Sequence, residues 1–417
     1  VVGEEEFRQL GEKQAVRLRG GPMVGRRGPT FAAIWLRTTR PADVSVVVQK
    51  ADASLFFDPE KATVESDLTA VCRLDGLEPF TEYEYDVLVD GESVYGTGEM
   101  PSFRTAPAAG QKVKFSVGFG GGARYIPGKE GIWSTVARRD PLAFLFLGDN
   151  VYIDQPRRRD VQRAYYYRRQ MNPHFRELSS SAAIYAIWDD HDFGKNDTAG
   201  GLDTFKPDWK LPVYKVFRQN WINPYYGGGL EQPGCWHHFS LGDVDFIMTD
   251  GRYYRDFKQG TMLGPDQKKW LKERLRAAKG RFVVLASGTL WTETADKGGR
   301  DSWQGVRKER DEIFDAIVEH QVPGVILISA DRHRTDVYKI DHEGCYPLYE
   351  FETSKLTNNH THGTKDAAMW SYNKGNFFGM LTFDLTKEDP TVTFRCITAE
   401  GEEPYSLTLN RSELDFE

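Results

Sequence analysis

The chain has 417 residues, 40% of them hydrophobic, with a formal net charge of -7 and a pI near 5.8. This length and apolar content predict two folded domains and exclude a disordered chain. The acidic balance argues against a general binder of nucleic acid or anionic membranes, because such proteins need a basic surface. No run approaches the ~18 to 20 apolar residues of a membrane-spanning helix. If the protein binds phosphate, the binding site must therefore be locally basic or contain metal ions.

The sequence starts Val1-Val2-Gly3, without an initiating Met. Such a start is typical of a mature exported protein, and it is equally typical of a trimmed chain. The first interpretation predicts a secreted or periplasmic location. The cysteines are widely spaced and form no CxxC pair, which predicts isolated thiols rather than a zinc knuckle or a dense disulfide framework. They are Cys72, Cys235, Cys345 and Cys396.

Residues 1–110 are predicted to form an N-terminal β-sandwich and a linker. Several short β-type runs follow one another without intervening helices, a pattern typical of a sandwich. These runs are Thr30–Arg37, Val44–Gln49, Leu68–Leu74 and Glu82–Val89. The stretch Leu74–Tyr85 (LDGLEPFTEYEY) resembles part of a fibronectin type III-like module. The small residues of Thr105–Gly110 are the predicted linker.

Residues 111–417 are predicted to form a layered α/β domain. Short apolar strands alternate with amphipathic helical stretches, which indicates a central sheet covered by helices. The strand runs are Val113–Phe119, Leu142–Leu147, Ile184–Trp188, Val244–Thr249, Phe282–Ala286 and Val325–Ser329, and the helical stretches are Arg158–Leu178, Asp266–Ala278 and Val306–His320. Four late strands are Thr335–Ile340, Leu348–Thr353, Phe377–Leu385 and Val392–Thr398. The domain is therefore expected to hold a mixed sheet, or two mixed sheets packed together and flanked by helices.

Acidic and histidine residues follow three of these strands directly, where α/β folds place their sites. The segments are LFLGDNVYID with Asp149 and Tyr152, IYAIWDDHDFGKND with Asp189, Asp190, His191 and Asp192, and ILISADRHR with Asp331 and His333. One such cluster alone is explained equally well by a helix cap or a turn. Its repetition at three strand ends predicts a shared metal site.

These residue types suit hard cations. Carboxylate, phenolate and imidazole can hold two metal ions about 3.5 to 4 Å apart, and such a pair polarises a phosphoryl group while activating a water or hydroxide. A tyrosine ligand is informative because ionising a phenol at neutral pH needs ~4 kcal/mol of differential stabilisation. A trivalent metal ion can supply that stabilisation.

The ordered set GDNVY, WDDHDFGKND and ADRH resembles the alkaline phosphatase D (PhoD-like) family of metallophosphatases, in which a β-sandwich also precedes the catalytic domain. The resemblance implies that Asp149 is the bridging carboxylate. It implies that Tyr152 and His333 bind iron(III), and that Asp190 and Asp331 bind calcium. Relatives often carry Asn where this chain has Asp190, and the extra charge favours a divalent ion.

The resemblance also implies substrate and catalytic residues. In the broader calcineurin-like architecture a histidine at the position of His191 contacts phosphate or protonates the leaving oxygen, and Asp192, with Asp189 as a second candidate, is expected to orient it. The alternative for His191 is a structural histidine. Arg252, in TDGRYYR, is expected to bind phosphate as a fork, or else to form a surface salt bridge. Asn196 is a further predicted substrate contact.

One departure from the family concerns Gly120. The family carries an iron-binding cysteine at the end of the first catalytic strand, where this chain reads FSVGFGGGAR and Gly120 is the aligned residue. Without a thiolate, manganese, magnesium or zinc become alternatives to iron and calcium. The glycine run could present backbone N–H groups to phosphate, or simply make a turn. His360 and His362, in TNNHTHG, could line the cleft or bind a surface metal, although a loop without a catalytic role is the stronger interpretation.

The sequence therefore predicts a phosphomonoesterase or phosphodiesterase that uses a metal-bound hydroxide at a site of two or more metals and acts on a small phosphoester. One alternative is a phosphodiesterase with two divalent ions and an altered first metal site. Another is a catalytically weakened protein that binds a phosphorylated ligand. The natural substrate, the metals and the oligomeric state are not predicted.

Overall fold

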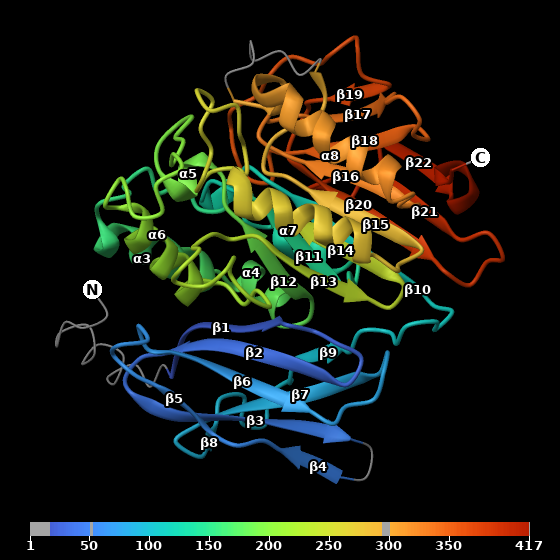
Figure 1. Cartoon of the computed structure of the whole chain (residues 1–417). Helices are drawn as coiled ribbons and strands as arrows, with labels where there is room; N and C mark the ends of the chain where they lie inside the picture. The colour runs from blue at the N-terminus through green and yellow to red at the C-terminus, as the bar shows by residue number, and fades with distance from the viewer. Residues whose placement is uncertain (1–16, 51–52, 294–300, 417) are drawn as a thin grey trace.

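The computed structural model describes residues 17–50, 53–293 and 301–416. Two parts follow one another along the chain and pack together (Figure 1). The described residues of the N-terminal part, coloured blue to cyan, form strands and no helix, and the larger part, coloured teal to red, combines strands and helices. The candidate site residues all belong to the larger part.

The N-terminal strands are β1 (Leu18–Gly25), β2 (Phe31–Thr38), β3 (Ala42–Lys50), β4 (Ala53–Phe56), β5 (Glu60–Ala62), β6 (Thr69–Asp75), β7 (Glu82–Val89), β8 (Glu92–Ser93) and β9 (Ser102–Arg104). The later strands are β10 (Lys114–Gly120), β11 (Ala143–Leu147), β12 (Ala183–Ile187), β13 (His237–Leu241), β14 (Val244–Met248), β15 (Phe282–Ala286), β16 (Val325–Ser329), β17 (Thr335–Ile340), β18 (Leu348–Thr353), β19 (Trp370–Tyr372), β20 (Phe377–Asp384), β21 (Thr391–Thr398) and β22 (Tyr405–Asn410). The helices are α2 (Ile132–Ala137), α3 (Arg159–Gln170), α4 (Pro173–Ser179), α5 (Asp190–Phe193), α6 (Lys210–Asn220), α7 (Gly264–Ala277) and α8 (Arg307–Glu319), with 3-10 turns η1 (Pro127–Lys129), η3 (Trp303–Val306) and η4 (Arg411–Leu414).

The N-terminal part contains two antiparallel sheets, ordered β1-β2-β6 and β4-β3-β7-β8, with β5 on β3 and β9 on β7. Alternation along β7 buries Tyr83, Tyr85, Val87 and Val89, because one face of each sheet packs inward. β1 is not among the predicted runs, since its sequence LRGGPMVG is rich in glycine and lacks the usual strand signal. The likeness to fibronectin type III stays a prediction.

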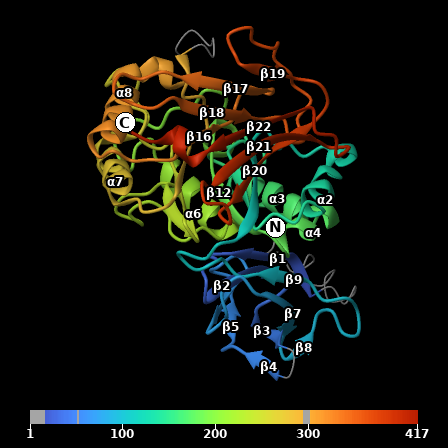
Figure 2. The ribbon, with the colours of Figure 1, turned by 90° about the vertical axis from the view of Figure 1, so that its right-hand side faces the viewer.

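The larger part contains two mixed sheets, ordered β12-β11-β10-β20-β21-β22 and β13-β14-β15-β16-β18-β17-β19. β10, β11 and β12 run parallel, as do β14, β15, β16 and β18, and antiparallel strands complete both sheets. The sheets face each other across a buried core, where Phe383 contacts Phe246 and Phe282 at ring-centroid distances of 6.1 and 5.6 Å. Figure 2 shows α7 and α8 on one side of the sheets and α2, α3 and α4 on the other. The prediction of two mixed sheets flanked by helices is confirmed.

The predicted helix Arg158–Leu178 is wrong in one respect, because two helices, α3 and α4, occupy this stretch. Pro173 lacks an N–H and opens α4 at its first position, which ends the preceding helix. The Asn172 side chain caps the new helix by accepting a hydrogen bond from the Phe175 N–H at 3.1 Å. The Asn-Pro dipeptide therefore marks the break.

The first sheet of the N-terminal part packs against α3, α4 and α6 of the larger part (Figure 1). The indole N–H of Trp35 donates to the Gln219 carbonyl at 3.0 Å, and the Tyr85 hydroxyl donates to the Ser180 carbonyl at 2.8 Å. The Arg27 guanidinium, itself buried, donates to the Ser181 carbonyl at 2.7 Å. Buried polar contacts of this kind fix the two parts in one orientation.

Two features of the whole chain bear on its surroundings. In the part of the chain that the structure describes, no helix is both long enough and apolar enough to cross a membrane. The cysteines are free thiols, three of them buried and Cys345 half-buried.

Candidate metal centre and active site

The candidate site lies where β11, β12 and β16 end. The first acidic residue after each strand is Asp149, Asp189 and Asp331 respectively. The backbone there is strained, with φ of 54° at Asp149, 52° at Tyr152, 83° at Asp331 and 49° at His333. Residues other than glycine adopt this left-handed region rarely, and such strain concentrates at functional sites. The strand ends thus aim these side chains at a cost in backbone energy.

Asp149, Asp190 and His191 form the centre of the site, with one ligand atom of each within 4.8 Å of the others. The His191 backbone N–H lies 3.3 Å from Asp149 Oδ1 and 3.1 Å from Asp190 Oδ1, so the two carboxylates meet at one point. Each aspartate is only 2% exposed. Burial, and then the charges of neighbouring carboxylates, raise the pKa of Asp149 well above its usual range. A cation would relieve this repulsion, so the residues present fit a metal ion.

Tyr152 closes one side of this centre. Its ring stacks on the His191 imidazole with centroids 4.4 Å apart, and its hydroxyl accepts a hydrogen bond from Asn358 Nδ2 at 2.6 Å. Burial, and then the charge of Asp149, raise the pKa of Tyr152 well above its ordinary value. A phenolate at this position therefore requires a cation beside it.

Asp331 and His333 lie beside this cluster. Both are buried, with exposed fractions of 7% and 8%. Asp331 Oδ2 lies 3.4 Å from Thr289 Oγ1, and the His333 backbone N–H donates to Ser354 Oγ at 2.6 Å. Burial, and then the charges of Asp190 and Asp331, raise the pKa of Asp189, as expected when these carboxylates lie close together. The structure thus brings the residues of all three strand ends to one region.

The residue that orients His191 is Asp154. The His191 Nδ1–H donates to Asp154 Oδ1 at 2.7 Å, which leaves Nε2 free to act on a substrate. Burial lowers the pKa of His191, but the Asp154 hydrogen bond and the nearby carboxylates outweigh it and raise the pKa overall. Sequence reasoning missed Asp154, although it ends the same GDNVYID segment and has a positive φ of 55°.

Asp192, which was expected to orient His191, has a different role in the structure. Its carboxylate accepts the backbone N–H groups of Asn150, at 2.9 and 3.0 Å, and of Val151, at 3.0 Å. Burial raises the pKa of Asp192 to about 6. Asp192 therefore holds the loop that carries Asp149 and Tyr152, and the expectation of direct orientation is corrected.

Arg252, expected to be a phosphate fork, is fully buried. Its guanidinium donates to Asp189 through Nε and to Asp301 through Nη1 at 2.7 Å, and its Nη2 lies 3.8 Å from Asp190 Oδ1. Burial lowers the pKa of Arg252, but the charges of Asp189 and Asp301 outweigh it and raise the pKa well above its usual value. Because carboxylates already accept its N–H groups, Arg252 is not placed to bind phosphate. Because it is fully buried, it does not form a surface salt bridge either, so both expectations for Arg252 are corrected. Asp301 itself was missed, because nothing in its local sequence marks it.

We predict that Arg252→Leu destabilises the fold by about 3 to 5 kcal/mol, because it leaves the buried Asp189 carboxylate without its cationic partner. The free energy of unfolding, measured by urea denaturation, tests this. Arg157→Leu, which breaks an exposed 2.8 Å pair with Asp208, serves as the control and should have no measurable effect. Equal stability of the Arg252 variant and the wild type would show that the guanidinium does not compensate this charge.

Three other predicted residues lie at the edge of the site. Asn196 is exposed in the turn after α5, next to Asp197, whose backbone N–H donates to Asp190 Oδ2 at 2.6 Å. His360 and His362 approach His333, with ring centroids 5.1 and 5.6 Å from it, and their Nε2 atoms are 3.0 Å apart. Both loop histidines therefore belong to the neighbourhood of the site.

The structure shows which glycine of the run lies nearest the candidate ligands, while the alignment of Gly120 with the family cysteine stays a prediction. The atoms nearest a Cβ at Gly120 belong to Leu356, the first at 3.2 Å, whereas a Cβ at Gly122 would come within 3.3 Å of His333 Nδ1. The position that faces the candidate ligands is therefore Gly122 and not Gly120. With φ of 69° and the Lys355 backbone N only 2.8 Å from that Cβ, residue 122 has no room for a side chain. A cysteine cannot replace this glycine without a shift of the loop.

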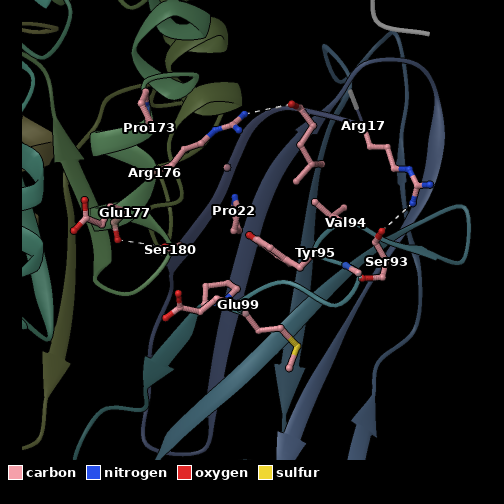
Figure 3. A pocket seen from close by; sticks show the side chains of 15 residues that line it. Arg17, Pro22, Ser93, Val94, Tyr95, Glu99, Pro173, Arg176, Glu177 and Ser180 are labelled. Carbon is pink, nitrogen blue, oxygen red and sulfur yellow. Dashed lines mark hydrogen bonds between the residues drawn. The ribbon is translucent and has the colours of Figure 1, made fainter. Parts of the chain in front are cut away.

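A cavity of about 920 Å³ lies elsewhere. Figure 3 shows it between the N-terminal sheets and α4, with Tyr95 and Glu99 facing Arg176 and Glu177 across it. None of the predicted site residues lines this cavity. It is a crevice between the two parts of the chain.

Two mixed sheets packed face to face, with buried carboxylates and imidazoles at the strand ends, define a layered α/β protein with a candidate metal centre. A model of the PhoD-like phosphatase family matches residues 117–402, more than half of the chain. The chain therefore belongs to the PhoD-like phosphatase family. Residues 15–107 match a family described only as a domain of unknown function.

Known proteins of similar sequence and structure agree with this assignment. Alkaline phosphatase D of Bacillus subtilis (strain 168) is 22% identical over 310 residues, which are 62% of this chain and 52% of that protein, so the match spans about half of the relative. A solved structure of PhoD has a TM-score of 0.78 at 16% identity, covering 96% of this chain and 92% of that chain. Purple acid phosphatase PPD1 from yellow lupin (Lupinus luteus) seeds has a TM-score of 0.67 at 13% identity, covering 94% and 74%. At these identities the structural likeness establishes the fold alone.

Proposed function

We propose that this protein hydrolyses phosphate esters with the help of bound metal ions. The observation that carries the proposal is the convergence of Asp149, Asp190 and His191 at two strand ends of a PhoD-like phosphatase domain. The carboxylates can hold cations, and the imidazole beside them can exchange a proton. Monoesters and diesters both fit this chemistry, and membership in a phosphatase family supports phosphoester hydrolysis.

The donor atoms support hard cations at two positions. Asp149, Tyr152 and His333 would hold a first ion, iron(III) by family resemblance, and Asp149, Asp190 and Asp331 a second, calcium by the same resemblance. Gly122 offers no thiolate, so the first position has oxygen and nitrogen donors only and should also accept manganese, magnesium or zinc. When bound, these ions would neutralise the phosphoryl oxygens and activate the attacking water.

His191 is the residue best placed to move a proton. Its ring is held between the Tyr152 ring and the Asp154 carboxylate, so its orientation is fixed before a substrate binds. The hydrogen bond at Nδ1 directs Nε2 to the open side, where it can protonate the departing oxygen. Asp192 contributes indirectly, because it fixes the backbone of the loop that presents Asp149.

We predict that a strong chelator abolishes hydrolysis of an aryl phosphate and that added metal ions restore it, because the chain shows no other cofactor motif. The measurement is the initial rate, with metal content determined by elemental analysis at each step. A sample treated with the chelator already saturated with iron(III) controls for effects of the chelator other than metal removal. Full activity in protein shown to be free of metal would refute the proposal.

A further inference from the structure

The site has a basic side that the proposed mechanism does not use. Arg332 lies between Asp331 and His333 in the chain, and it is only 6% exposed. Its Nη1 is 3.8 Å from Asp331 Oδ2, beyond hydrogen-bonding distance, and neither Nε nor Nη1 has a hydrogen-bond partner in the described part of the chain. The N–H groups of buried guanidinium ions are normally hydrogen-bonded, so these two indicate a missing acceptor.

Lys355 is the second cation on this side. It is 6% exposed, and its Nζ donates to the Asn373 carbonyl at 3.2 Å, while no carboxylate of the described residues lies within 4 Å. Its φ of 93° is rare for a long side chain and indicates local strain. Hydrogen bonds from the Lys355 and Leu356 N–H groups to the Gly121 carbonyl, both 3.0 Å, hold the strained segment in place. The strained Lys355 backbone thus lies beside the glycine run, and its ammonium group is bound to the Asn373 carbonyl.

Lys129, at the end of η1, is the third cation. Its Nζ donates to the Asn358 carbonyl at 3.3 Å, and Asn358 in turn donates to the Tyr152 hydroxyl. The Lys129 ammonium also has no carboxylate within 4 Å among the described residues. Burial, and then the charge of Lys129, lower the pKa of Lys355, as expected when two ammonium groups share one region. This cluster of like charge stands out in a chain of net charge -7.

We propose that Arg332, Lys355 and Lys129 form an anion subsite that binds a second phosphate group of the substrate. The preferred substrates would then be phosphoesters that carry at least two phosphate groups. Two ammonium groups that face no described carboxylate within 4 Å, together with a guanidinium whose nearest carboxylate oxygen is 3.8 Å away, match an anion with several acceptor oxygens. They also disfavour a metal ion on His360 and His362, because His362 already lies in the positive field of Arg332. The proposal rests on the proposed function, since it places this subsite beside the reacting phosphoryl group.

The test compares two ligands that differ by one phosphate group, adenosine 5'-monophosphate and adenosine 3',5'-bisphosphate. Calorimetry on the metal-loaded protein should show the bisphosphate binding at least about tenfold more tightly, the gain expected of one charge-assisted hydrogen bond. Lys129→Met and Lys355→Met should each reduce this ratio towards one. The control Lys387→Met, at the exposed β20–β21 turn far from the strand ends, should leave the ratio and the hydrolysis rate unchanged.

The outcomes separate this inference from the proposed function. A ratio near one in the wild type, or one that neither lysine substitution lowers, would overturn the subsite even if aryl phosphates are hydrolysed. Lysine-dependent tight binding without hydrolysis of any phosphoester would instead refute the proposed function and support the subsite. Circular dichroism of each variant shows whether a lost ratio reflects lost charge or lost folding, and Lys129, which has an ordinary backbone conformation, decides the case if Lys355→Met unfolds.

Discussion

Asp149→Asn is expected to release both metal ions and to reduce hydrolysis to the level of the metal-free protein. The Asp149 carboxylate lies at the centre of the site, within reach of Asp190, Tyr152 and the His191 N–H. An amide has one acceptor oxygen and no charge, so it cannot bridge two cations or balance them. Metal per protein, measured by elemental analysis, and the initial rate give the result.

The folded state should survive this substitution. Asp149 is buried among other carboxylates whose charges raise its pKa, so removing one charge relieves repulsion in the metal-free protein. We therefore expect the thermal midpoint without metal to be equal to or higher than that of the wild type. Asp208→Asn, an exposed carboxylate, is the control for both measurements. Retention of two metal equivalents by Asp149→Asn would show that another residue bridges them.

The positions of the site residues in the sheet could be predicted from the sequence because buried parallel strands leave a plain signal. The runs before Asp149 and Asp189 are apolar, the run before Asp331 is apolar except for Ser329, and the carboxyl ends of such strands meet at one edge. The family motifs lie on these same strand ends. Local sequence was sufficient for these positions because each site residue comes immediately after a strand in the chain.

The partners of these residues could not be predicted, because they depend on how distant loops pack. The sequence places Arg252 correctly after β14. Only the fold shows that its guanidinium donates to Asp301, which is 49 residues away in sequence. Asp154 reaches His191 across 37 residues through a turn whose geometry the sequence does not encode plainly. Which glycine of the run faces His333 could not be predicted for the same reason. A run of glycines has no side-chain pattern. Only the folded structure shows that a Cβ at Gly122 would face His333 and that a Cβ at Gly120 would face Leu356.

His191→Ala is expected to lower turnover by about 10² to 10⁴-fold, the usual contribution of a general acid, with metal content nearly unchanged. His191 borders the cluster, but its imidazole is held by Asp154 and by the Tyr152 ring rather than by other carboxylates. The loss should be smaller for esters of acidic phenols, because a departing phenolate of low pKa needs little protonation. Rates for a series of aryl phosphates of graded leaving-group pKa provide the measurement. An equal loss across the series would make His191 a phosphate-binding residue instead of an acid.

Asp154→Asn tests the same assignment through pH. A general acid must be protonated, so the turnover of the wild type should fall as the pH rises through the pKa of His191. The hydrogen bond and charge of Asp154 contribute to raising that pKa, and their removal should move this basic limb to lower pH while the metal content stays constant. The exposed pair His342–Asp315, joined at 2.8 Å, gives the matched control Asp315→Asn, which should leave the pH profile of turnover in place. A basic limb at the same pH in Asp154→Asn and the wild type would mean that His191 does not supply the proton and that another group titrates in this range.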